Sequence, residues 1–197
     1  ALDGLAAQGV RFEQAFCTDP VCVPSRFSLM TGRYPSAIGL RSNDSSHIAS
    51  VPEFIRAHGL GALLREAGYE TVYGGKEHLP KMRAADVGFE YIEPDQRDRL
   101  ASTCADYLRQ THDRPFFLVA SFINPHDICY MAIRDCGAGG RSQKLLERGQ
   151  TELDALDEAL MRPDGVDDAT FLAEHCPPLP PNHAVQEDEP EAIRRLV

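Results

Sequence analysis

A continuous apolar run, Pro115–Phe122, constrains the fold of this chain more than any other segment. A strand that is apolar at every position is typical of a parallel sheet whose two faces are both covered. Residues 69–73 predict a second strand, which follows a helical pattern that ends at Gly68. These features indicate an α/β protein with a mostly parallel central sheet flanked by helices, and the run is expected to be a central strand buried on both faces.

Hydrophobic periodicity predicts the remaining elements. A third strand is expected at Val10–Phe16, where apolar and polar residues alternate. Residues 34–52 are rich in turn-forming residues and are expected to make an extended connection. Within the predicted helices, Leu29, Met30 and Cys104 are expected to face the core. Helices are expected at residues 2–8, 24–31, 60–67 and 97–111, and residues 142–161 are expected to form a surface helix or a helical pair.

The segment around Cys22 contains the first candidate functional group. Pro24 fits the first position of a helix, and Gly32 can close that helix in the left-handed conformation. Cys22 then lies just before the helix N-terminus, where backbone N–H groups and the helix dipole favour an anion. Arg26, one turn further on, can reach an oxyanion or the group that Cys22 carries. The alternative is a buried structural cysteine beside an exposed arginine.

Two further segments place polar side chains directly after predicted strands. A pair of glycines lets the chain turn sharply before Lys76 and His78. Lys76 supplies a compact positive charge, and His78 can exchange a proton near neutral pH. His126 follows the apolar run, and the neighbouring Asp127 can orient its imidazole or cap a turn. Taken one by one, each of these side chains can also be an ordinary surface residue.

The three segments resemble the signatures of a known family. Residues 22–33, with Cys-Val-Pro-Ser-Arg followed by Thr-Gly-Arg, resemble the signature of the type I, formylglycine-dependent sulfatases of the alkaline-phosphatase-like superfamily. Residues 68–71 and 75–78 resemble the second sulfatase signature, although Glu77 stands where that family usually has tryptophan. Residues 115–126 resemble the family segment whose histidine contacts the sulfate group.

The resemblance implies a sulfuric ester hydrolase. In the family, the cysteine equivalent to Cys22 is converted to Cα-formylglycine by a formylglycine-generating enzyme. One hydroxyl of its gem-diol attacks sulfur and expels the alcohol, and the other loses a proton and thereby releases sulfate. Fixed positive charges stabilise the sulfuryl oxygens, and His78 or Lys76 handles protons. The implied catalytic residues are Cys22, Arg26, Lys76, His78 and His126, with Lys76 and His126 also binding the substrate.

The resemblance also implies a divalent metal, usually calcium, bound by the formylglycine at position 22 and by hard oxygen ligands. The family's acidic ligand motifs match nothing in this chain, so we expect one set before Ala1 and another after Val197. Residues 1–197 are therefore expected to be a partial, N-terminal part of a sulfatase catalytic domain that is inactive alone. The resemblance itself covers residues 1 to about 130.

Composition narrows the expected partners. A net charge of −10 argues against a general nucleic-acid binder, and no apolar run is long enough to span a membrane. No export leader opens the chain, so a periplasmic or secreted location requires a signal ahead of Ala1. Six scattered cysteines favour mostly free thiols. The expected substrate is a sulfate ester, with sulfated carbohydrates as the first class to test.

Other interpretations stay open. A phosphodiesterase or phosphonate monoester hydrolase of the same superfamily can carry the same Cys-x-Pro-x-Arg motif, and the chain can also be a catalytically dead fragment. A tyrosine-phosphatase loop fits poorly, because it needs five residues between cysteine and arginine and this chain has three. A zinc-binding module, with no close Cys-x-x-Cys pair, would draw on Cys17, Cys22, His78, His126 and Cys129.

Overall fold

The computed structural model describes two compact units, residues 1–128 and residues 129–197. Within them, the described residues are 2–135, 144, 146–147, 149–161, 164–179, 184 and 190–191. Part of the expected 142–161 helix, the end of the proline-rich connector and most of the acidic tail lie outside these residues. All candidate site residues belong to the first unit, which is described first.

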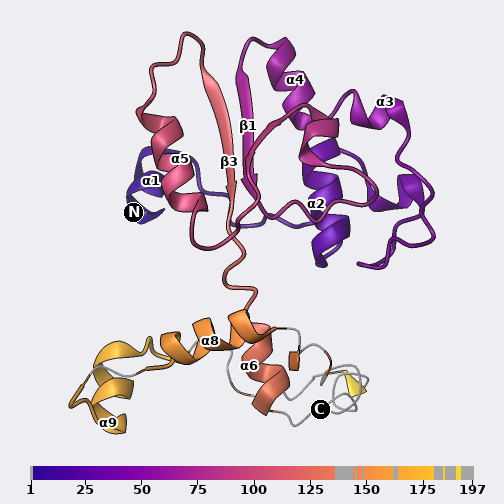
Figure 1. The fold of residues 1–197 in the computed structure, drawn as a ribbon. Coiled ribbons are helices and arrows are strands. Elements are labelled where there is room, and N and C mark those ends of the chain that lie inside the picture. The colour runs from indigo at the N-terminus through magenta and orange to yellow at the C-terminus, as the bar shows by residue number, and fades with distance from the viewer. Residues whose placement is uncertain are drawn as a thin grey trace. The chain divides into compact units, whose positions relative to one another are not determined.

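The first unit contains a three-stranded parallel sheet within the described residues, in the order β2-β1-β3. β1 (Glu70–Gly75) lies between β2 (Glu90–Glu93) and β3 (Phe116–Ser121), and both pairings are parallel. The register places Glu70 opposite Phe116 and Gly75 opposite Ser121, so β1 and β3 end side by side (Figure 1). The predicted parallel α/β fold is confirmed.

The place of the apolar run in this sheet differs from the expectation. β3 lies at one edge of the described sheet and is half-buried to exposed along its length, whereas β1 is buried at five of its six positions. The expectation that the run would be the central, fully covered strand is wrong for the described residues. An apolar pattern indicates how much of a strand's surface must be buried. It does not predict whether the strand will be hydrogen-bonded to a neighbouring strand on each side.

Helices cover both faces of the sheet. Figure 1 shows α5 (Leu100–Arg109) on one side of β1 and β3, and α2 (Cys22–Thr31) with α4 (Leu60–Glu66) on the other. Cys104 of α5 is buried, as expected. Shorter helical turns lie between these elements: η1 (Pro35–Ile38), α3 (Glu53–Arg56) and η2 (Ala84–Val87).

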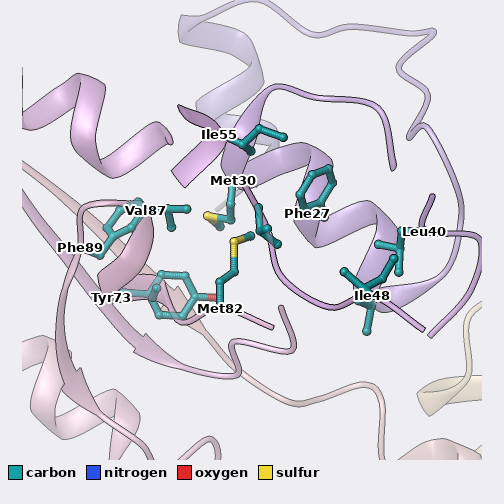
Figure 2. Close-up of a cluster of buried hydrophobic side chains, with 12 residues drawn as sticks. Phe27, Met30, Leu40, Ile48, Ile55, Tyr73, Met82, Val87 and Phe89 are labelled. Carbon is teal, nitrogen blue, oxygen red and sulfur yellow. The ribbon is translucent and has the colours of Figure 1, made fainter. Parts of the chain in front are cut away.

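The core forms where α2 meets the residues that follow it. Val23, Phe27 and Met30 line one stripe of α2 and are almost completely buried, and Figure 2 shows Phe27 and Met30 among the other core side chains. The connection at 34–52 is irregular, as expected, but it also contributes buried side chains to this core. Leu29 is 66% exposed, contrary to expectation, because a helix presents only one such stripe to a core. The buried residues from the connection are Leu40, Ile48 and Val51.

The N-terminal segment is the clearest departure from the predicted elements. α1 (Leu2–Gln8) is a helix that ends before Gly9, as expected. Residues 10–16 form no strand, and Val10, Phe12 and Phe16 are all strongly exposed. An alternating pattern forms a strand only where another strand supplies hydrogen bonds, and no described strand lies beside this segment.

The second unit is helical where it is described. Residues 144, 146 and 147 are helical, and Gly149 then precedes α8, so the described part of the 142–161 segment is helical on both sides of that glycine. An ion pair between Arg134 and Asp157 joins two of its helices. No helix among the described residues of the chain has the length and apolar character needed to cross a membrane. The elements are α6 (Ile128–Asp135), α8 (Gln150–Ala159), α9 (Asp168–Thr170) and η3 (Phe171–His175).

Candidate active site

Cys22 is the first residue of α2, so the helix begins two residues earlier than the sequence predicted. Pro24 is therefore the third helical residue, a position where its missing N–H still costs nothing. Gly32 closes the helix at φ 65°, with its N–H donating to the carbonyl of Ser28, as expected. Cys22 itself is half-buried.

The helix N-terminus offers fewer free N–H groups than the sequence suggested. Asn43, from the connection at 34–52, accepts a hydrogen bond from the N–H of Val23 at 2.9 Å. Pro24 has no N–H, and the N–H of Ser25 donates to the carbonyl of Val21 at 3.0 Å. An anion beside Cys22 must therefore be bound mainly by side chains, and Asn43 instead fixes the end of the helix.

A pocket of about 460 Å³ lies between α2 and β3 and opens beside Cys22. Arg26 also lines it, whereas Lys76, His78 and His126 are not among the described residues around it. Most of the surface that lines the pocket is apolar. Its lining consists of Pro20, Val21, Cys22, Ser25, Arg26, Leu29, Met30, Tyr73, Val119, Ala120 and Ser121.

Arg26 joins α2 to the ends of β1 and β3. Its Nη1 donates to the carbonyl of Lys76 at 2.8 Å, to Oγ of Ser121 at 2.9 Å and to Oη of Tyr73 at 3.3 Å. Nη2 and Nε have no hydrogen-bond partner in the described part of the chain. The guanidinium is thus held in place by one nitrogen and keeps its other donors for an anion.

Lys76 leaves β1 through a turn that is held by hydrogen bonds from three directions. Its N–H donates to the carbonyl of Ser121 at 2.8 Å, and its carbonyl accepts from Tyr73 Oη at 2.6 Å as well as from Arg26. Gly75, with φ 86°, makes the turn that the sequence predicted, and its carbonyl accepts from Tyr91 Oη at 2.8 Å. The backbone that carries Lys76 is therefore rigidly placed beside Arg26.

His78 lies within electrostatic range of three other candidate site residues. His78 is exposed to solvent, yet desolvation by the protein around its imidazole lowers its pKa, and the positive charges of Lys76, Arg26 and His126 lower the pKa further. The physical cause is that each neighbouring cation opposes the addition of another positive charge to the ring. His78 therefore keeps its neutral form to lower pH than an isolated histidine.

His126 occupies the turn after β3, and its neighbour Asp127 has a partner that the sequence did not indicate. Arg97 donates to the two carboxylate oxygens of Asp127, from Nε at 2.9 Å and from Nη2 at 3.1 Å. Nδ1 of His126 lies 3.6 Å from Oδ1 of Asp127, which is longer than a hydrogen bond. Asp127 is buried, so this pairing fixes the turn that carries His126.

Several positioning residues were missed by sequence reasoning. Tyr73 and Ser121 were treated only as strand residues, Asn43 only as a turn former, and Arg97 as part of a helix. Three of the contacts join residues 20, 30 and 95 positions apart, so no local spacing marks them. Tyr73 offers a usable signal, because it lies in a predicted strand and a buried tyrosine hydroxyl needs a hydrogen-bond partner.

Replacing Tyr73 by phenylalanine is expected to destabilise the protein by about 1–3 kcal/mol, because the partly buried carbonyl of Lys76 loses its closest donor. The urea midpoint of unfolding measures this loss. Tyr69→Phe is the matched control, since the Tyr69 hydroxyl makes no hydrogen bond to any described residue. Equal midpoints for the two variants would contradict the role given to the Tyr73 hydroxyl.

The described residues do not by themselves fit a divalent-metal site. No group of three or more His, Cys, Asp or Glu side chains is arranged to hold a metal ion in the described ranges. The candidate groups around Arg26 and His78 are cationic or proton-exchanging, whereas calcium takes six to eight oxygen ligands. None of the five described cysteines is in a disulfide.

The fold and the site together define an α/β protein in which a cysteine and an arginine at the start of a helix lie beside two parallel strands, and a lysine and two histidines follow the carboxyl ends of those strands. A family model described as sulfatase matches residues 1–137. The chain therefore belongs to the sulfatase family, within the alkaline-phosphatase-like superfamily. Members of this family in general use a formylglycine and a divalent metal.

Individual relatives agree with this assignment. Delta 4,5-hexuronate-2-O-sulfatase of Bacteroides thetaiotaomicron is 34% identical over 146 residues, which are 65% of this chain and 29% of the relative. Human N-sulphoglucosamine sulphohydrolase is 32% identical over 135 residues, which are 64% of this chain and 26% of the relative. A crystal structure assigned to a sulfatase of Bacteroides thetaiotaomicron is 32% identical, with a TM-score of 0.57, over 71% of this chain and 32% of that one.

The chain thus spans about a third or less of the length of the relatives it matches. The matched part includes all of the candidate site residues, which lie before residue 137.

Proposed function

We propose that the whole protein hydrolyses a sulfate monoester to an alcohol and sulfate. The observation that carries this proposal is the contact between Arg26 and the Lys76 turn, which joins two sulfatase signatures beside Cys22. The roles of Cys22, Arg26, Lys76, His78 and His126 remain predictions that this geometry supports.

The side chains of this chain would act as follows. The free donors of Arg26 and the ammonium of Lys76 would bind the sulfuryl oxygens and oppose the negative charge that grows on them. His126, held by the turn that Asp127 and Arg97 fix, would bind the same group. His78, kept neutral near pH 7, would act as a base and accept a proton from a hydroxyl at position 22.

Cys22 fits the modification that the family uses. Its side chain is half-buried and faces an open pocket, so an aldehyde of similar size would fit there. A formylglycine at this position would supply, as its hydrate, one hydroxyl to attack sulfur and a second whose deprotonation releases sulfate. This requires a formylglycine-generating enzyme as a maturation partner. Calcium is our proposal for the family's metal, and no step is derived through it because the described residues do not form its site.

Sulfated carbohydrates are the proposed substrate class. The names of the two relatives above designate a sulfated hexuronate and a sulfated glucosamine, and another relative is named an N-acetylgalactosamine-6-sulfatase. The described residues contain no feature that selects one sugar over another.

Purified full-length protein tests the proposal when it is offered sulfate and phosphate esters of one alcohol, with calcium present. We expect turnover of the sulfate ester at a rate well above that of the phosphate ester. Peptide mass spectrometry of the same sample should find formylglycine at position 22. A preference for the phosphate ester would favour the phosphodiesterase alternative, and an active protein with only a thiol at position 22 would overturn the mechanism.

Because the pKa of His78 is lowered, kcat/KM is expected to stay constant down to a lower pH than it would with an ordinary histidine. If the neutral imidazole is the active form, kcat/KM falls only when the ring gains a proton, which occurs below its ordinary pKa of 6.5. The acid limb of the pH profile of kcat/KM should therefore lie below pH 6.5 and disappear in His78→Gln. An acid limb at or above that value would show that His78 does not set it.

A further inference from the structure

Glu77 is the residue at which this chain departs from the second sulfatase signature, and the structure gives it two specific bonds. Oε1 accepts a hydrogen bond from the N–H of Ala84 at 2.6 Å, and Oε2 accepts one from Nε of Arg83 at 2.7 Å. The Glu77 side chain is only 12% exposed. A tryptophan at this position would offer no acceptor, since the indole can only donate.

These bonds close the loop that carries Lys76 and His78. Ala84 begins η2, where a helical turn leaves its first N–H groups unpaired, so the carboxylate satisfies one of them. At its start, the loop is held through the carbonyls of Gly75 and Lys76. Arg83 also lies over the ring of Tyr91, at 5.5 Å, and Tyr91 binds Gly75. The two ends of the loop are therefore linked through Glu77, Arg83 and Tyr91.

The backbone inside this loop needs such a restraint. His78 has φ 46° and Lys81 has φ 51°, in the left-handed region that side chains other than glycine disfavour. A residue stays in that region only where the surrounding structure holds it. Release of the Ala84 end would let His78 return to a negative φ, and its imidazole would then turn away from Lys76 and Arg26.

We propose that Glu77 is a positioning residue, which fastens the loop at Ala84 and so holds the imidazole of His78 beside Lys76, Arg26 and His126. The expected effect of Glu77 on catalysis rests on the proposed sulfatase function. The bond to Ala84 is the essential one, because Arg83 is mostly exposed and its pairing is weakened by solvent.

Kinetics of the full-length protein on a sulfate ester test the catalytic consequence. Glu77→Ala is expected to lower kcat by about 10–100-fold while KM changes little. Glu77→Gln keeps an acceptor for Ala84 and should restore most of the activity, whereas Glu77→Asp keeps the charge but is too short and should not. Asp106→Ala is the matched control, because it removes an exposed carboxylate–arginine pair within α5, outside the loop, and should leave kcat unchanged.

NMR titration of the His78 imidazole tests the positioning without any turnover. The pKa of His78 should rise toward 6.5 in Glu77→Ala and Glu77→Asp, since the ring leaves its cationic surroundings, and should stay low in Glu77→Gln and Asp106→Ala. If the wild-type protein cleaves no sulfate ester, the proposed function fails and the titration still decides the positioning. If Glu77→Ala does not fold, the kcat and the His78 pKa of Glu77→Asp test the positioning instead. A wild-type kcat and His78 pKa in Glu77→Asp would overturn the proposal.

Discussion

Replacing Cys22 by alanine is expected to abolish sulfate-ester cleavage, with kcat reduced by about 10⁴-fold or more. Cys22 is the proposed source of the nucleophile, and its position at the first turn of α2 faces it into an open pocket beside Arg26. No other described cysteine lines that pocket, so no thiol nearby can replace it. The residual rate should be the small part that binding and fixed charge contribute without a nucleophile.

Cleavage of a chromogenic sulfate ester by the purified full-length variant measures this effect. Cys17→Ala is the matched control, because Cys17 is an exposed cysteine that does not line the Cys22 pocket. It should retain wild-type kcat. A Cys22→Ala variant that turns over substrate at the wild-type rate would remove the nucleophile from the proposal.

Replacing Gly75 by alanine is expected to destabilise the protein by about 3 kcal/mol or more, through two separate effects. A Cβ at Gly75 would lie 2.3 Å from the carbonyl oxygen of Ser121 in the neighbouring strand, where backbone cannot move without breaking the β1–β3 ladder. The φ of 86° adds the strain of a left-handed alanine. The same displacement would shift Lys76, so activity should fall together with stability.

Gly39→Ala separates the two effects. Gly39 has a similar φ of 72°, but a Cβ there would meet nothing within 4 Å. We expect it to cost only the conformational part, about 1 kcal/mol, as measured from urea unfolding curves. Equal losses of unfolding free energy in the two variants would show that the contact with Ser121 does not contribute to the destabilisation.

The sequence alone determined the local parts of this protein. The glycines before Lys76, the order of strand, turn and histidine, and the position of Cys22 at a helix start all depend on residues close together in the chain. Backbone conformation and side-chain periodicity act over these short distances, so the strands at 70–75 and 116–121 and their parallel arrangement followed from the pattern. The sulfatase signatures lie in these local segments.

Tertiary structure decided what holds the site together. The bonds from Arg26 to Ser121, from Val23 to Asn43 and from Arg97 to Asp127 join residues 95, 20 and 30 positions apart. Such contacts depend on how elements pack, and many side chains compatible with the same local pattern would not make them. The same reason explains why the alternating pattern at 10–16 did not become a strand and why the apolar run lies at an edge of the described sheet: hydrogen-bond partners come from the fold, not from the segment itself.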